Sequence, residues 1–278
     1  KPDDRELSND EIVTDLSKCA DSVHDWGKVN QVMFDPGKEG FRVLHRRDPM
    51  GDLFKILGVK YDCKLLMKEA CLSVYKTCNF KLRCLLRFRK FFADHLTVHL
   101  YKSHIMSRVE AVTAAVYHAA NDHLNLFDSM QNRLLTHMGI TDSFAFLNYN
   151  LAPLVTRRDI AMLGVIHKCV LGITHKALCK LFPFAPPAHR FPTRFSFQAH
   201  DKQLLDRCDG AQTDILQRSI FGLVRIYNML PQNVIDLDSV PKFQSALTQF
   251  VRVKCEAGTF NWQLTFHRIT QSTMRTRL

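Results

Sequence analysis

From residue 64 onward, apolar residues recur at the three- and four-residue spacing of amphipathic helices, and this periodicity constrains the fold more than any other feature. A proline-rich stretch at 183–197 interrupts the pattern and predicts a loop or linker. The pattern predicts helices over residues 65–92, 96–120, 124–138, 157–171, 176–182, 218–229 and 240–253. We therefore expect most of the chain to be α-helical.

The first 62 residues follow a different pattern. Ser8 and Glu11 have the spacing of a capping box, which predicts a helix that begins near residue 8 and ends near Gly27. Runs of apolar residues between turn signals then predict three short strands, at 32–34, 41–44 and 54–61. This α/β piece is too small to form a convincing core by itself, so the chain as a whole is expected to be α+β and predominantly helical.

Positive charge is concentrated in one of the predicted helical regions. The chain has 38 Lys and Arg against 27 Asp and Glu, and a net charge of +11 favours an anionic partner such as nucleic acid. Between Lys76 and Arg108 the only acid is Asp94. The basic residues of this stretch are Lys76, Lys81, Arg83, Arg87, Arg89, Lys90, Lys102 and Arg108.

Three of these residues, Arg83, Arg87 and Lys90, have the spacing of one helical face. A helix with one basic and one apolar face can lie along a duplex and contact phosphates without reading bases. The alternative is an ordinary solvated surface, although such a surface usually mixes positive and negative charges. We therefore expect this face to contact nucleic acid.

The cysteine and histidine spacing predicts no structural metal site, and the hydropathy pattern predicts no membrane span. The nine cysteines are scattered and never spaced as C-x-x-C, which is typical of buried thiols in a reducing compartment. His95 and His99 share a predicted helical face but have no third ligand nearby. No apolar stretch approaches the roughly 20 residues that span a bilayer. These features predict a soluble intracellular protein, cytoplasmic or nuclear.

Five motifs in order carry a family resemblance. They are Trp26–Gln31 before Phe34–Glu39, Phe54–Val59, Leu85–Arg89, Leu151–Leu154 with Arg157–Gly164, and Arg225–Pro231 before Phe243. Their order and spacing resemble the downstream half of reverse transcriptases encoded by LINE-like, non-LTR retrotransposons. The resemblance covers nearly the whole chain; each motif is weak alone, and the set is specific.

The resemblance implies an organisation and an activity. Residues 1–62 would be the end of a palm, 63–138 a helical thumb-like region, and 139–278 a helical C-terminal extension. The parent enzyme would perform RNA-directed DNA synthesis with Mg²⁺ held by a Tyr-x-Asp-Asp hairpin upstream of this segment. Asp3 and Asp4 follow a proline in a polar lead-in and are not expected to be that pair.

The segment alone is therefore expected to be inactive, to hold no cofactor, and to bind RNA template and DNA primer duplex beside the upstream fingers and palm of the same polyprotein. One alternative is a non-catalytic helical RNA-binding or assembly protein derived from such an element. Another is the product of a decayed element without a selected activity.

The resemblance also assigns roles to individual residues. Lys38 is the candidate auxiliary acid for pyrophosphate departure in the full enzyme, with an exposed turn lysine as the alternative. The segment Leu57, Gly58 and Val59 resembles the primer grip, and its alternative is a bulge or a tight strand exit. The nucleic-acid-binding candidates are Lys81, Arg83, Arg87, Arg89, Lys90, Arg157 and Arg158. For Arg157 and Arg158, the sequence leaves solvent, RNA and a buried carboxylate as equal options.

Overall fold

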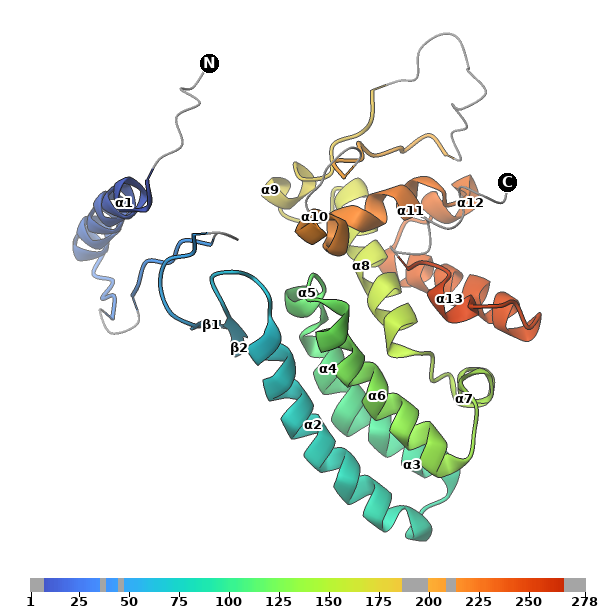
Figure 1. Ribbon diagram of the computed structural model, residues 1–278. Coiled ribbons are helices and arrows are strands. Elements are labelled where there is room, and N and C mark those ends of the chain that lie inside the picture. Colours follow the sequence, from blue (N-terminus) through green and yellow to red (C-terminus); the bar gives the residue numbers. More distant parts are fainter. Residues whose placement is uncertain (1–7, 36–38, 45–47, 187–199, 209–213, 268–278) are drawn as a thin grey trace. The chain divides into compact units, whose positions relative to one another are not determined.

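The computed structural model describes residues 8–35, 39–44, 48–186, 200–208 and 214–267. Contacts divide the chain into two units, Lys1–Glu69 and Ala70–Leu278, which are described separately. Helices dominate the described residues and the strands are short, which confirms the predominantly helical fold class (Figure 1). The second unit contains residues 70–138 of the region expected at 63–138 and the whole of the region expected at 139–278, while residues 63–69 belong to the first unit.

The first unit begins with helix α1 (Asn9–Val29). The predicted capping box is confirmed, because the Ser8 side chain accepts from the Glu11 amide while the Glu11 carboxylate accepts from the Ser8 amide. The helix continues past Gly27 to Val29, two residues beyond the predicted stop. Its apolar residues remain largely on the surface, and Trp26 is 57% exposed.

The strands of this unit differ from the prediction. Strands β1 (Phe54–Ile56) and β2 (Val59–Tyr61) form an antiparallel hairpin, so the expected continuous strand at 54–61 reverses direction at Leu57 and Gly58. Residues 32–34 form no strand, and residues 41–44 contribute only the isolated bridge between Val43 and Met50. Apolar alternation alone does not make a strand, since a ladder also needs a neighbouring backbone to pair with.

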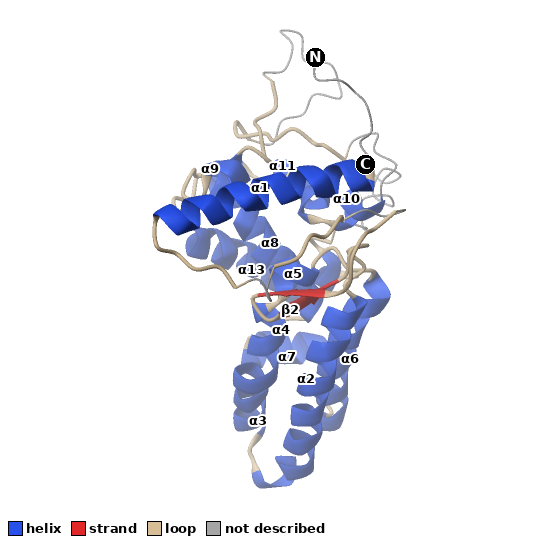
Figure 2. Cartoon of the chain, turned by 90° about the vertical axis from the view of Figure 1, so that its left-hand side faces the viewer, coloured by secondary structure: helices blue, strands red, loops and turns tan. Residues whose placement is uncertain are grey.

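The second unit starts with a group of helices that run beside one another. Helix α2 (Lys68–Phe88) begins at the unit boundary and is followed by a 3₁₀ turn, η2 (Arg89–Phe91). Helices α3 (Asp94–Tyr101) and α6 (Asn121–Met138) lie alongside α2 in both views (Figures 1 and 2). Buried side chains including Leu82, Tyr101, Phe127 and Leu134 fill the space between them.

The segment predicted as one helix over 96–120 is broken. After α3 the backbone forms a π-helical turn, η3 (Lys102–Met106), and continues as α4 (Ser107–Ala111) and α5 (Thr113–Val116). Similarly, the predicted helix at 218–229 is divided into α10 (Asp214–Arg218), the 3₁₀ turn η4 (Ile220–Leu223) and α11 (Val224–Asn228). Apolar spacing identifies these segments as helical but does not show where the hydrogen-bond register changes.

The remaining helices form the C-terminal part of this unit. The predicted helices at 157–171, 176–182 and 240–253 are present, and α7 and α12 are additional. Their bounds are α7 (Asp142–Tyr149), α8 (Leu154–Val170), α9 (Lys176–Cys179), α12 (Gln232–Ile235) and α13 (Val240–Glu256), followed by the 3₁₀ turn η5 (Trp262–Leu264).

Helices α8 and α13 pack closely at the centre of the C-terminal core. The Gln244 side chain of α13 fills the space beside Gly164 of α8, where an added Cβ would lie 2.4 Å from Gln244 Nε2. Beside this contact, the His167 ring stacks on Phe243 at 4.0 Å between ring centroids. His167 is fully buried, with Nδ1 at 3.0 Å from the Tyr227 hydroxyl and Nε2 at 2.9 Å from the Leu237 carbonyl. These contacts fix the core of the C-terminal part of this unit.

Candidate nucleic-acid interface

Helix α2 carries a continuous positive surface that we call the basic face. It consists of Lys76, Arg83 and Arg87 on the helix and Lys90 in the following 3₁₀ turn. All four side chains are exposed, and none has an ion-pair or hydrogen-bond partner within the described part of the chain. The opposite side of α2 is anchored by the buried residues Cys71, Cys78 and Leu82. Packing of the apolar side therefore directs the basic side chains away from the core.

Two other predicted contacts on this segment have structural partners instead. Arg89 donates to the His137 carbonyl at the end of α6 and to Asp94 Oδ1, the latter at 3.1 Å. Lys81 Nζ lies 3.4 Å from the His104 carbonyl. Arg89 thus ties the end of α2 to α6, and Lys81 is only partly free. The helix also ends at Phe88, so Lys90 is held by the 3₁₀ turn and not by the helix itself.

Exposed aromatic rings, which were not predicted from the sequence, accompany the basic face. Phe80 and Phe91 are each 69% exposed. Phe80 lies four residues after Lys76 and three before Arg83, which places it within the basic face. The Lys90 ammonium lies 5.0 Å from the centre of the Phe91 ring. The helical spacing of Phe80 from the basic residues was the signal that could have revealed this combination.

The primer-grip-like residues lie at a hairpin tip. Leu57 and Gly58 have positive φ angles of 47° and 87°, as required at both central positions of a tight two-residue turn, and Val59 begins β2. The Leu57 side chain is fully exposed, and a side chain at Gly58 would meet nothing within 4 Å. The glycine is therefore explained by the backbone angle, and the hairpin tip presents an open surface.

Several expected features fall outside the described residues. Lys38 lies there, as do Asp3 and Asp4, so their geometry is not part of the site. In the described ranges, no group of three His, Cys, Asp or Glu side chains is arranged to hold a metal ion. A helix long and apolar enough to cross a membrane is also not found among the described residues.

Arg157 and Arg158, at the start of α8, are engaged by carboxylates. Arg158 is only 5% exposed and donates through both terminal nitrogens to Asp128, at 3.0 and 2.8 Å. Arg157 pairs with Glu110. Of the three environments left open by the sequence, the structure shows a carboxylate partner for each arginine, although Asp128 and Glu110 are only partly buried. The bidentate pair joins α6 to α8, so the Arg158 guanidinium already has a carboxylate partner in this structure.

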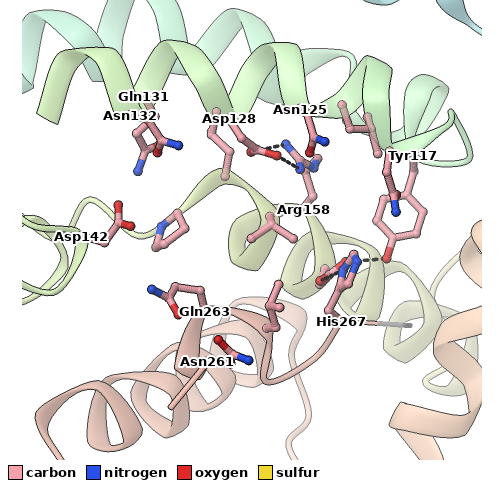
Figure 3. Close-up of a pocket in the computed structure, with 17 residues that line it drawn as sticks. Tyr117, Asn125, Asp128, Gln131, Asn132, Asp142, Arg158, Asn261, Gln263 and His267 are labelled. Atoms are coloured by element: carbon pink, nitrogen blue, oxygen red, sulfur yellow. Dashed lines mark hydrogen bonds and ion pairs between the residues drawn. The ribbon is translucent and has the colours of Figure 1, made fainter. Parts of the chain in front are cut away.

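The Arg158 and Asp128 pair lies in the wall of a cavity between α6, α7, α8 and the η5 segment, with a volume of about 400 Å³ (Figure 3). At one end of it, the fully buried Asp159 accepts from the Tyr117 hydroxyl at 2.6 Å and lies 3.1 Å from His267 Nδ1. At the other end lies Asp142 (Figure 3). Burial and the nearby Asp128 raise the pKa of the Asp142 carboxyl. No sequence pattern predicted this cavity, because its walls come from separate segments of the chain.

Comparison with known proteins adds no relative: no protein-family model, curated protein or solved structure matches the chain.

Proposed function

We propose that this chain is a nucleic-acid-binding module that holds primer-template duplex, as the helical thumb-like part of a LINE-like reverse transcriptase would. The observation that carries the proposal is the basic face of α2, with four exposed cations that have no ion-pair or hydrogen-bond partner among the described residues. Unpaired cations on a rigid helix are the usual means by which proteins neutralise a phosphate backbone.

The dimensions of the basic face suit a phosphate backbone. Lys76 and Arg87 are separated by eleven residues, or about 16 Å along the helix axis. That distance corresponds to about five nucleotides of one strand at 3.4 Å each. Three of the four cations lie within this length and Lys90 follows in the next turn, so the basic face can contact several phosphates at once. Nothing in the chemistry of these side chains distinguishes one base sequence from another. The expected binding is therefore tight at low salt and indifferent to sequence.

Exposed rings beside the cations extend what this surface can hold. Phe80 and Phe91 offer flat apolar faces at the same surface as Arg83 and Lys90. Aromatic rings of this kind stack on unpaired bases, with about 1–3 kcal/mol for each base. A primer-template substrate has both a duplex and a single-stranded template extension, so it supplies partners for both the cations and the rings.

Salt dependence of binding tests the proposal. Each phosphate that is neutralised on B-DNA adds about 0.9 to the magnitude of the slope of log affinity against log salt, so four contacts predict a slope of about −3.6. Replacing Arg83, Arg87 and Lys90 with Gln keeps helix propensity and removes three charges. The slope should then become shallower by about 2.7, by a similar amount for every sequence tested.

A matched control is available in the same unit. Lys168, Lys176 and Lys180 are exposed, and among the described residues their side chains have no hydrogen-bond or ion-pair partner. Replacing these three with Gln therefore removes the same charge from another surface. The control variant should keep the wild-type slope within about one unit. If the two triple variants lose affinity equally, net charge accounts for binding and the basic face has no special role. If neither variant changes the slope, the proposal fails.

Two further observations distinguish a reverse transcriptase segment from a non-catalytic RNA-binding or assembly protein. In the proposed enzyme, the auxiliary Lys38, the hairpin Leu57–Val59 and Mg²⁺ act only together with the upstream fingers and palm. An in-frame Tyr-x-Asp-Asp strand in the coding sequence upstream of Lys1 would support that assignment. A non-catalytic RNA-binding or assembly protein should instead bind single-stranded RNA as well as primer-template duplex, through the same basic face.

A further inference from the structure

The cavity of Figure 3 has an unbalanced charge. Three carboxylates line it, from Asp128, Asp142 and Asp159, against one guanidinium from Arg158 and the His267 ring. Arg158 forms an ion pair with Asp128, and Asp159 forms hydrogen bonds with Tyr117 and His267. Asp142 has no hydrogen-bond or ion-pair partner within the described residues. In a chain of net charge +11, this leaves a local site that favours positive charge.

A second group at the same end of the cavity lacks a hydrogen-bond donor. Gln131 is only 2% exposed, and its Nε2 donates to the Ala152 carbonyl at 3.2 Å. Its Oε1 is buried and has no hydrogen-bond partner among the described residues. Figure 3 draws Gln131 and Asn132 above Asp142 on one side of the cavity. A buried amide oxygen without a donor costs about 1–3 kcal/mol, so the Gln131 oxygen and the Asp142 carboxylate, which line the same cavity, can each accept a hydrogen bond from a bound ligand.

We propose that this cavity binds a small organic cation bearing a guanidinium or ammonium group, which donates to Asp142 and to the Gln131 amide oxygen. The cavity volume of about 400 Å³ lies in the range of small-molecule sites. A guanidinium has several donors in one plane and can satisfy both acceptors, while the amides of Asn132 and Gln263 remain available to the rest of the ligand. The inference does not depend on the nucleic-acid proposal, since none of these residues belongs to the basic face.

The first arm of the test compares two probes that differ mainly in charge. Butylguanidinium and the neutral butylurea have nearly the same shape, and both can be titrated into the full chain by calorimetry at pH 7.5. We expect saturable binding of butylguanidinium with a Kd of about 1 mM or tighter, which requires only about 0.5 kcal/mol per heavy atom. Butylurea should bind at least tenfold more weakly. Equal binding of the two probes, or no saturation by butylguanidinium at 10-fold higher concentration, would overturn the proposal.

The second arm uses matched variants. Asp142→Asn keeps the shape of the side chain and should weaken butylguanidinium binding at least tenfold. Asp122→Asn is the control, because Asp122 is an exposed acid in the first turn of α6 and does not line the cavity. It should change the affinity by less than twofold. Asn132→Asp adds a carboxylate at the same end and should tighten binding severalfold. Unchanged affinity in both cavity variants contradicts the assignment, and circular dichroism of each variant establishes that it is folded.

Discussion

The two units of the chain bury their apolar residues to very different degrees. Between residues 8 and 69, only Gly27, Cys63 and Met67 are buried among the described residues. The described residues beyond Glu69 include a continuous core around Leu163, Tyr227 and Phe243. Both units contain a well-formed long helix with an amphipathic sequence. The formation of a helix therefore does not ensure that its apolar face is buried. Periodicity predicts the first, and only the arrangement of neighbouring elements supplies the second.

Hydrogen exchange should give the largest contrast between the units. Helix α1 has little tertiary burial, so its amides should open with free energies near zero to about 2 kcal/mol. The amides of α8 and α13 should exchange only through opening that approaches the global stability of about 5 kcal/mol or more. Mass-spectrometric exchange on the intact chain measures both. Comparable protection of α1 and α8 would show that the first unit is stabilised by something other than its own burial.

Side-chain truncation should sharpen the same contrast. Phe243 is fully buried and stacks on His167, so Phe243→Ala should lower the free energy of unfolding by about 3–5 kcal/mol. Trp26 is a larger aromatic residue but is 57% exposed, and Trp26→Ala should lower it by less than about 1 kcal/mol. Urea denaturation compares the two variants with the wild type. A large loss for Trp26→Ala would contradict the exposed position of this ring.

Much of the helical fold was accessible from local sequence signals. Ser8 and Glu11 predicted the start of α1 because a capping box involves neighbours in the chain. The signal for α7 was also present and was overlooked: Thr141 caps the helix by accepting from the Phe144 amide. By contrast, the hairpin at Leu57 needed a turn with positive φ at a leucine, which sequence statistics disfavour. The failed strands had no ladder partner that a local pattern could reveal.

The candidate sites show the same limit at longer range. The exposed positions of Arg83 and Arg87 follow from helical spacing, because their own helix decides which side is apolar. The ion pair of Arg158 does not follow from helical spacing, because its partner Asp128 is thirty residues away on another helix. The cavity around Asp142 depends on four segments at once. Residues that act through contacts distant in sequence were therefore left undecided or missed.

Acidification should produce a smaller difference, confined to the second unit. Burial lowers the pKa of His167 and His200 below the ordinary value of 6.5, although hydrogen bonds to the carbonyls of Leu237 and Tyr227 partly oppose the shift. Because the unfolded chain binds protons more readily than the folded one, the stability from these neutral histidines is present above pH 6.5. It is lost as the pH falls below 6.5, by up to about 1.4 kcal/mol per pH unit for each histidine.

Denaturation of the wild type at pH 7.5, 6.5 and 5.5 measures this loss. A His167→Gln and His200→Gln double variant should be less stable at pH 7.5 and should show a shallower decline between pH 6.5 and 5.5. If its decline is as steep as that of the wild type, other groups are responsible for the pH dependence.

The segment around η5 closes back onto the first turns of α8. The Thr156 hydroxyl donates to the Gln263 carbonyl at 2.7 Å, and Asp159 lies 3.1 Å from His267 Nδ1, although these partners are separated by 107 and 108 residues. The Trp262 ring completes the closure by stacking on Phe146 at 5.4 Å. Such long loops are entropically unfavourable to close before the intervening helices have formed. Docking of η5 should accordingly be a late kinetic step during synthesis on the ribosome, and α8 should remain sensitive to proteases until that step is complete.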